Sequence, residues 1–263
     1  IAISEVNKHA LAIRNSIHPQ KVDNIGDITC ANWDHISDLD LFSGGFPCQP
    51  FSALGSMKGF KDPRVKAMYA MRDMILDTLP RYVLLENVGG ILHSKNREAL
   101  NRFLSSFYPS YLPPTFITSN PNDLGWFQSR TRVFICLSRI DQPPWEPRVT
   151  KTYIQTWRDV VDSNPDPKHF FKGKPKSRIQ IVVSENSKKF ECITRRGITA
   201  HCGRASWIQH GDGFRSPTTK ELFHLFGYDP IPKIEMGGLI SRSSFSMAMG
   251  NSWHVGHVAN LLK

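Results

Sequence analysis

A proline-flanked cysteine follows a short apolar run and has the setting of a reactive thiol. Cys48 lies between Pro47 and Gln49-Pro50, a few residues after the apolar run at residues 38–42. Prolines stiffen a loop, so the expected loop can hold the sulfur at the mouth of a pocket. A nearby positive charge, or the N–H groups at the start of a helix, would favour the thiolate over the thiol. Taken alone, this segment is also compatible with a tight turn around an inert cysteine.

An acid and a pair of arginines elsewhere in the chain carry complementary polar groups. Glu86 ends the apolar run at residues 81–85, and a carboxyl group beside a low-dielectric pocket can act as a proton donor. Arg130 and Arg132 alternate, so we expect both on one face at the edge of a strand, where guanidinium groups suit a carbonyl oxygen or a phosphate. Each feature has a plainer alternative: a helix cap or surface acid for Glu86, and an ordinary exposed pair for the arginines.

Short apolar runs alternate with helical patterns over residues 1 to about 140, which predicts a parallel α/β sheet. The first expected helix is residues 7–17, and the expected strands are residues 1–6, 38–42, 81–85 and 132–138. In open α/β sheets, ligands bind beyond the carboxyl ends of the strands. Glu5, residues 44–52 and Glu86 all follow such ends, so we expect them at one edge of the sheet.

A proline-rich break at residues 141–147 predicts a linker between two domains. The expected division is a larger domain of residues 1–142 plus 238–263 and a small, loop-rich domain of residues 143–237. The small domain contains a strand-like piece at 179–183 and a helical pattern at 221–226. A closing helix is expected at residues 251–262, entered through Gly250.

The net charge of +10 is concentrated in the smaller domain. Residues 147–210 hold 13 Lys or Arg against 5 Asp or Glu, with aromatic residues interleaved. This mixture suits a polyanion such as nucleic acid, and a solvated basic face is the plainer alternative. The candidates for contact with bases or phosphates are Arg195, Arg196, His201 and Arg204. Arginine is the commonest reader of guanine edges, and simple phosphate contact is equally open.

Composition excludes several other classes of protein. The five cysteines are odd in number and never form a CxxC pair, which argues against a disulfide framework or a metal site and for a reducing interior. No apolar run approaches the roughly 18 residues that span a bilayer. The first residues lack the pattern of a signal peptide, so we expect an intracellular protein without membrane contact.

The order and spacing of these segments resemble the cytosine-5 DNA methyltransferase family over nearly the whole chain. The matching segments are residues 4–6, 26–28, 45–52, 86–88, 128–132, 215–228 and 250–252. The resemblance implies a Rossmann-like, S-adenosylmethionine-dependent methyltransferase sheet, with residues 143–237 as a target-recognition domain. It also implies methyl transfer from S-adenosylmethionine to C5 of a flipped-out cytosine in double-stranded DNA.

The resemblance assigns a covalent mechanism to the site. Addition of the Cys48 thiolate to C6 of cytosine makes C5 electron-rich, which is covalent catalysis. Glu86 is implied at N3 and the 4-amino group and Arg132 at O2, with Arg130 as a catalytic-site residue that supports the loop. The further residues implied in substrate or DNA binding are Phe46, Gln49, Ser52, Asn87 and Gln128.

The cofactor residues implied by the resemblance form an incomplete set. They are Glu5, Val6, Asp27, Ile28, Pro47, Asn251 and Ser252. The family's glycine-rich turn, which cradles the methionine part of the cofactor, is expected about 20 residues before the ribose-binding acid and has no counterpart in the sequence. A missing N-terminal segment, a complementing polypeptide and a chain unable to bind cofactor are the three explanations. The complete set of Cys48, Glu86 and both arginines favours the first two.

Two other functions stay open. A branch of the same family methylates transfer RNA and carries a Cys-Phe-Thr tripeptide, which Cys192-Ile193-Thr194 matches only in part. A non-catalytic subunit that binds DNA beside an active partner would explain the absent glycine turn. The expected location is the cytoplasm or nucleoid for a bacterial or phage protein, and the nucleus for a eukaryotic one.

Overall fold

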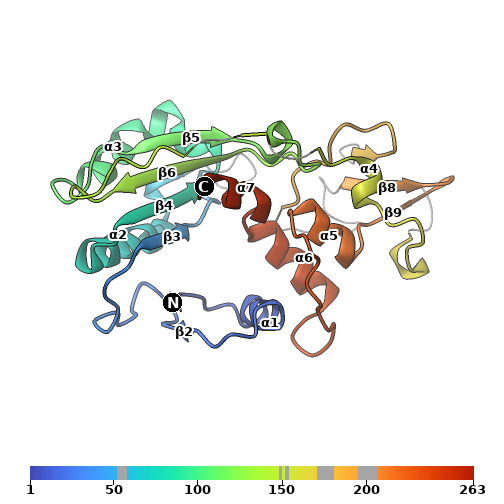
Figure 1. Ribbon diagram of the computed structural model, residues 1–263, viewed down its shortest axis with the longest axis horizontal. Helices are drawn as coiled ribbons and strands as arrows, with labels where there is room; N and C mark the ends of the chain where they lie inside the picture. Colours follow the sequence, from blue (N-terminus) through green and yellow to red (C-terminus); the bar gives the residue numbers. More distant parts are fainter. Residues whose placement is uncertain (52–57, 148–149, 152–153, 171–180, 195–205) are drawn as a thin grey trace. The chain divides into compact units, whose positions relative to one another are not determined.

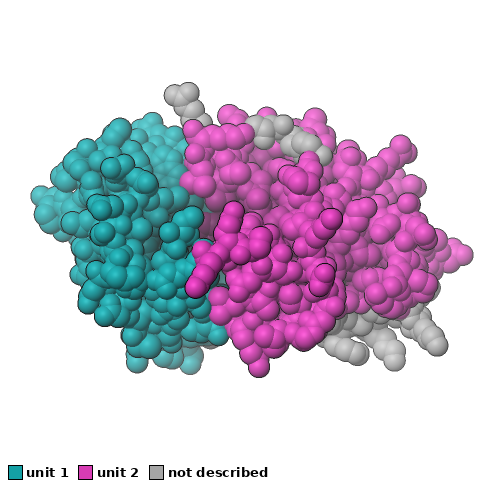
Figure 2. All heavy atoms as spheres, turned by 60° about the horizontal axis from the view of Figure 1, so that its bottom comes forward, with its two compact units in different colours: residues 1–6, 22–119, 131–147 teal, residues 7–21, 120–130, 148–263 magenta. Residues whose placement is uncertain are grey.

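The computed structural model describes residues 1–51, 58–147, 150–151, 154–170, 181–194 and 206–263. The chain forms two compact units (Figure 2). Unit 1 comprises residues 1–6, 22–119 and 131–147, and unit 2 comprises residues 7–21, 120–130 and 148–263. Residues 238–263, which the sequence places with the larger domain, therefore share a compact unit with the smaller one. The functional division at residues 142 and 237 stays a prediction.

Unit 1 is built around a four-stranded sheet, which confirms the α/β class. In spatial order its strands are β3 (Leu41–Gly45), β4 (Tyr82–Asn87), β6 (Arg132–Ser138) and β5 (Thr115–Ser119) (Figure 1). β3 and β4 are parallel, whereas β6 runs antiparallel to both of its neighbours. The sheet is therefore mixed. The expectation of a parallel sheet holds for the direction of β3, β4 and β5 and is wrong for β6, because the chain reverses after β5 and β6 returns between β4 and β5.

Helices and 3-10 turns of unit 1 pack against this sheet. The helices are α2 (Lys66–Thr78) and α3 (Arg97–Ser105), and the 3-10 turns are η1 (Gly59–Lys61), η2 (Pro63–Val65), η3 (Gly89–Leu92) and η4 (Ser94–Asn96). Met68 and Ile75 of α2 and Phe103 of α3 are buried with Val83 and Ile135 of the central strands. The apolar runs of β4 and β6 are thus covered by side chains at helical spacing, which stabilises the sheet through burial of apolar surface.

A two-stranded parallel sheet in unit 1 pairs β1 (Ala2–Ile3) with β2 (Asp23–Asn24). The expected strand at residues 1–6 is therefore only two residues long. The residue after β1 is held by a side-chain hydrogen bond instead of strand pairing, since the Ser4 hydroxyl donates to the Gly26 carbonyl at 2.7 Å. Gly26 has φ of +76°, a conformation that favours glycine.

Unit 2 is mainly helical with a small three-stranded sheet. Its helices are α1 (Lys8–Ile17), α4 (Trp157–Val160), α5 (Thr219–Leu225), α6 (Arg242–Asn251) and α7 (Val255–Leu261), with 3-10 turns η5 (Pro121–Leu124) and η6 (Pro167–His169). The strands are β7 (Ile181–Val183), β8 (Ser206–His210) and β9 (Gly213–Arg215). Phe127, Phe190, Phe223, Phe226 and Phe245 are buried in one core. No helix in the described part of the chain is both long and apolar enough to cross a bilayer.

The start of α1 agrees with the sequence, and the end of the chain does not. Asn7 caps α1 by accepting from the backbone N–H of His9 at 2.9 Å. The expected closing helix at 251–262 is observed as the shorter α7, because Asn251 still belongs to α6, which stops at Ser252, where the backbone is extended. His254 then caps α7 through its side chain.

Candidate active site

The loop that carries Cys48 is held by backbone hydrogen bonds and by close packing. Phe51 donates its backbone N–H to the Cys48 carbonyl at 3.0 Å, and Gly59 donates to the Pro50 carbonyl at 2.9 Å. Phe51 is buried, and its carbonyl oxygen lies against Gly90, where a side chain would collide with it. Only glycine fits at position 90, so the loop is pressed against the turn that follows β4.

Asn87 and the strand register place this loop beside Glu86. Gly45, the last residue of β3, lies opposite Glu86 in the parallel pairing with β4. The buried Asn87 donates its side-chain N–H to the Phe46 carbonyl at 3.2 Å. Cys48 therefore leaves the sheet at the strand end that carries Glu86, as expected from the sequence.

Glu86 and Arg132 form an ion pair across the sheet. Arg132 Nε lies 2.7 Å from Glu86 Oε1, and their side chains are only 14% and 10% exposed. Both lie at the ends of neighbouring strands, β6 and β4, which are paired in antiparallel register. A carboxylate and a guanidinium held together in this way offer an acceptor and several donors at one place.

Arg64 is a charged group near Cys48 that the sequence did not reveal. Its Nε and Nη2 lie 2.8 and 2.6 Å from the two carboxylate oxygens of Asp62, which is buried. This hydrogen-bonded pair raises the pKa of Arg64, and an electrostatic interaction with Cys48 raises it further. Arg64 is therefore within electrostatic range of the sulfur. The Asp62-Pro63 pair, which caps η2, is the local signal that could have drawn attention to this turn.

Arg130 does not share a strand face with Arg132. It precedes β6, so strand alternation does not apply to it, and that expectation was wrong. Its buried guanidinium donates to the carbonyl oxygens of Ile193 at 2.9 Å, Gly250 at 3.1 Å and Ser252 at 2.8 Å. Arg130 thus ties together three segments of unit 2, which suits a supporting role.

The remaining residues predicted to bind substrate fall into three groups. Phe46 is buried in the core of unit 1, and Gln49 follows Cys48 in the turn and is partly exposed. Gln128 is fully buried in unit 2, and its amide atoms have no hydrogen-bond partner. Ser52, Arg195, Arg196, His201 and Arg204 lie outside the described residues.

The cofactor residues predicted in unit 1 follow three successive strands. Glu5 follows β1, and its backbone N–H and carbonyl are bound by the Asn24 side chain at 3.1 and 3.0 Å. Asp27 follows β2 and accepts from the backbone N–H and the hydroxyl of Thr29, which lowers its pKa. Pro47 follows β3. A nucleoside carries hydroxyl, amino and apolar groups. The carboxylates of Glu5 and Asp27 suit the first two as hydrogen-bond acceptors, and the exposed side chain of Val6 suits the third.

The other predicted cofactor residues have structural contacts as well. Ile28 packs against the core of unit 1. Asn251 ends α6 in unit 2, and the Ser252 hydroxyl donates to the Met249 carbonyl at 2.9 Å. The described part of the chain holds no cluster of residues that could bind a metal ion, and its four cysteines are free thiols.

The mixed sheet of unit 1, with a cysteine loop and an acid–arginine pair at its strand ends, places the chain in the α/β class with a polar site at one end of the sheet. The family of C-5 cytosine-specific DNA methylases matches residues 1–234. The chain belongs to this family.

Curated relatives agree with this assignment. The chain is 33% identical over 234 residues to the orphan methyltransferase M.SssI of Spiroplasma monobiae, covering 80% of this chain and 61% of that protein. It is 35% identical over 140 residues to the type II methyltransferase M.MthTI of Methanothermobacter thermautotrophicus, covering 51% and 41%. It is 33% identical over 142 residues to the orphan methyltransferase M.Rho11sI of Bacillus phage rho11s, covering 54% and 28%. The matches thus span between 28% and 61% of the length of these relatives.

Solved structures share the fold at low sequence identity. The Entamoeba histolytica methyltransferase EhMeth has a TM-score of 0.81 at 17% identity, over 99% of this chain and 88% of that one. The S. pombe Dnmt2 methyltransferase has a TM-score of 0.76 at 21% identity, over 98% and 88%. These similarities establish the methyltransferase fold.

Proposed function

We propose that this chain is the body of a DNA cytosine-5 methyltransferase, with Cys48 as its nucleophile. The observation that carries the proposal is the arrangement at one end of the sheet in unit 1. Three contacts support the proposal: Gly45 pairs with Glu86, Asn87 donates to the Phe46 carbonyl, and Glu86 forms an ion pair with Arg132 at the strand end where the Cys48 loop begins. Membership of the family supplies the chemistry to which this set is suited.

The proposed reaction begins at the sulfur. The Cys48 thiolate adds to C6 of cytosine, and the electron pair of the C5–C6 bond becomes available at C5. Glu86 contacts N3 and the 4-amino group, and Arg132 donates to O2. These contacts stabilise the added ring by protonation or hydrogen bonding. S-adenosylmethionine supplies an electrophilic methyl group when bound. After C5 is methylated, loss of its proton restores the double bond and expels the Cys48 thiolate.

The proposed substrate is a cytosine taken out of a DNA duplex. A base stacked inside a duplex cannot reach a thiol on a protein loop, so it must be extruded at a cost of a few kcal/mol. Contacts between phosphates and the basic residues of unit 2 would offset part of that cost, since the region from 147 to 210 carries an excess of positive charge.

The cofactor is proposed to be held by the strand ends of unit 1, with help from a segment outside this sequence. Glu5 and Asp27 would bind the nucleoside part, as their places after β1 and β2 suggest. The glycine-rich turn for the methionine part is proposed to come from an upstream segment or a complementing polypeptide. Supporting this, β3 and β1 each have a hydrogen-bonded neighbour on only one side among the described residues, which leaves two strand edges able to pair.

Methyl transfer with a labelled cofactor tests the proposal. The chain, with and without an added upstream segment, is given duplex DNA and transfer RNA in parallel. Label is expected in DNA only, absent with Cys48→Ala and retained with Cys30→Ala, whose cysteine is exposed in unit 1. Label in transfer RNA would favour the RNA substrate. A chain that binds DNA but transfers nothing even with the upstream segment would be the non-catalytic subunit.

A further inference from the structure

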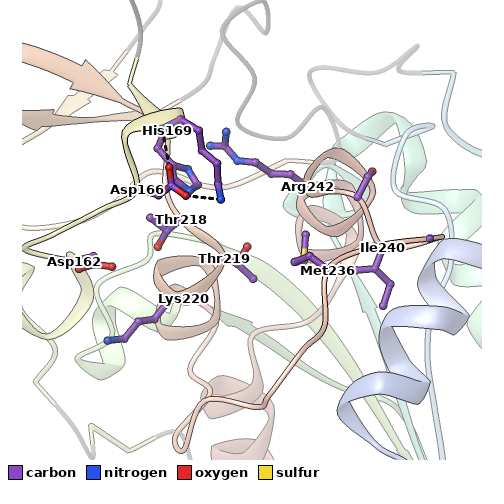
Figure 3. Close-up of a pocket in the computed structure, with 13 residues that line it drawn as sticks. Asp162, Asp166, His169, Thr218, Thr219, Lys220, Met236, Ile240 and Arg242 are labelled. Carbon is purple, nitrogen blue, oxygen red and sulfur yellow. Dashed lines mark hydrogen bonds and ion pairs between the residues drawn. The ribbon is translucent and has the colours of Figure 1, made fainter.

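Unit 2 contains a cavity that the proposed chemistry does not use. Its volume is about 560 Å³, and it lies between the turn η6, the first turn of α5 and the loop that leads into α6 (Figure 3). All of its lining residues belong to unit 2. The residues that matter for its chemistry are Lys168, His169, Lys220, Gly238, Ser241 and Arg242.

One wall of the cavity is kept open by two glycines. Gly237 and Gly238 have φ of +149° and +52°, and Gly237 exchanges backbone hydrogen bonds with Ile240 at 3.0 and 2.8 Å. A side chain added at either glycine would meet no atom within 4 Å, so it would project into open space. The two glycines therefore add no side chains to this part of the lining, whereas Met236 and Ile240 of the same segment line the cavity with apolar side chains.

The opposite wall holds a guanidinium without a carboxylate partner. Arg242 extends from α6 toward His169 and Asp166 (Figure 3). Its Nη2 donates to the Ser216 hydroxyl and the Pro217 carbonyl, whereas its buried Nε has no hydrogen-bond partner among the residues that the structure describes. Burial lowers the pKa of Arg242, and the nearby charge of Asp166 opposes this only in part. A half-buried cation that contacts only neutral groups lacks the opposite charge that would offset the cost of burying it.

His169 adds a second unsatisfied group to the same wall. It is 5% exposed, and its Nδ1 has no hydrogen-bond partner within the described part of the chain. Burial lowers the pKa of His169, and the positive charges of Arg242 and Lys168 lower it further, against Asp166 and Glu221. His169 lines the cavity, and a buried ring nitrogen without a protein partner can take up a hydrogen bond to a bound group.

The acids at this cavity are already engaged. The Asp166 carboxylate lies 2.6 Å from Lys168 Nζ and accepts the backbone N–H of Lys168 at 2.9 Å. The Asp162 carboxylate accepts the backbone N–H of Asn164 at 3.0 Å. Lys220 has no acidic side chain within ion-pair distance among the described residues. The backbone N–H at Asp162 does not neutralise its charge. The cavity nevertheless carries a net positive charge, because three cations, Lys168, Lys220 and Arg242, line it against the two acids.

We propose that this cavity binds a phosphate group, held by Arg242 and His169 with Lys220 at the rim. Planar guanidinium groups bind phosphate oxygens through paired N–H donors, and the Ser241 hydroxyl lines the same space. The phosphate comes either from the backbone of a nucleic acid or from a free nucleotide. The first source rests on the proposed function, and the second does not.

Thermal unfolding in inorganic phosphate tests the site without DNA or cofactor. The melting temperature is compared in phosphate and in chloride at equal ionic strength for the wild-type chain, Arg242→Gln, Lys220→Gln and Arg102→Gln. Arg102 is an exposed cation of unit 1 and serves as the matched control. Phosphate is expected to raise the melting temperature of the wild type and of Arg102→Gln, and to raise it much less in the two cavity variants. Lys220 is exposed, so its variant tests the site even if Arg242→Gln weakens the fold.

The salt dependence of duplex binding separates the two sources. For a backbone phosphate, Arg242→Gln lowers the slope of log affinity against log salt by about 0.9, the value for one phosphate contact. An unchanged slope, together with lost stabilisation by inorganic phosphate, assigns the site to a free nucleotide. The proposal is overturned if phosphate stabilises all four chains equally, or if it stabilises none of them beyond chloride. Neither the melting temperature nor the salt dependence of duplex binding depends on methyl transfer, so both can be interpreted even if the methyl-transfer assay fails.

Discussion

The buried ion pair between Arg215 and Glu221 should contribute strongly to the free energy of unfolding of unit 2. Both side chains are fully buried, and Arg215 Nη1 and Nη2 lie 2.8 and 2.6 Å from the two carboxylate oxygens. The same carboxylate accepts the backbone N–H groups of Thr218 and Asp162, each at 2.7 Å. The pair therefore joins β9, the start of α5 and the segment after α4.

Arg215→Met should lower the free energy of unfolding of unit 2 by about 3–5 kcal/mol, because it leaves the Glu221 charge buried without its partner. Urea unfolding followed by tryptophan fluorescence measures this, since Trp207 is buried in unit 2. The matched control is Arg158→Met on α4, an exposed position where a change within about 0.5 kcal/mol is expected. Adding Glu221→Leu to Arg215→Met should recover part of the loss, because no lone charge remains. A loss below about 1 kcal/mol for Arg215→Met would refute this reasoning.

Three further predictions concern the loop of Cys48 and a buried histidine. Gly90→Ala should displace the Phe51 carbonyl and with it the cysteine loop, so methyl transfer should fall at least tenfold while the far-ultraviolet spectrum stays unchanged. Arg64→Gln should move the pH midpoint of Cys48 alkylation upward, as followed by mass spectrometry of the Cys48 peptide, since it removes a positive charge near the thiolate; an unmoved midpoint would show that Arg64 is too distant. Burial lowers the pKa of His254 from 6.5 to about 3. Between these two pH values the unfolded chain binds more protons than the folded chain, so the free energy of unfolding should fall as the pH drops from 6.5 toward 3. His254→Phe should flatten that slope in urea titrations, and an equally steep slope would contradict the assignment.

Local patterns predicted several elements and their ends. β6 matches the expected residues 132–138 because one continuous apolar run fills a strand that is buried on both faces. α1 begins where Asn7 provides a side-chain cap. Cys48 and Glu86 were placed at one sheet edge from strand order alone, and the register of β3 with β4 agrees.

Other features depend on contacts between residues that are distant in the sequence, which local patterns do not specify. The antiparallel direction of β6 is set by pairing, which an apolar run does not encode. The break between α6 and α7 is stabilised by Arg130, which binds the carbonyl groups of Gly250 and Ser252 from more than a hundred residues away. Arg64 comes near Cys48 only through the folding of η1 and η2.

The adduct between protein and pyrimidine is the most direct test of the central claim. A pool of duplexes carrying 2-pyrimidinone in place of cytosine accepts a thiolate at C6 without any methyl transfer, so no cofactor is needed. After digestion, mass spectrometry should find the modified base on the peptide that contains Cys48, at a rate reduced by Glu86→Gln. An adduct on Cys30 or Cys192 instead, or no adduct with duplexes that the chain binds, would contradict the account.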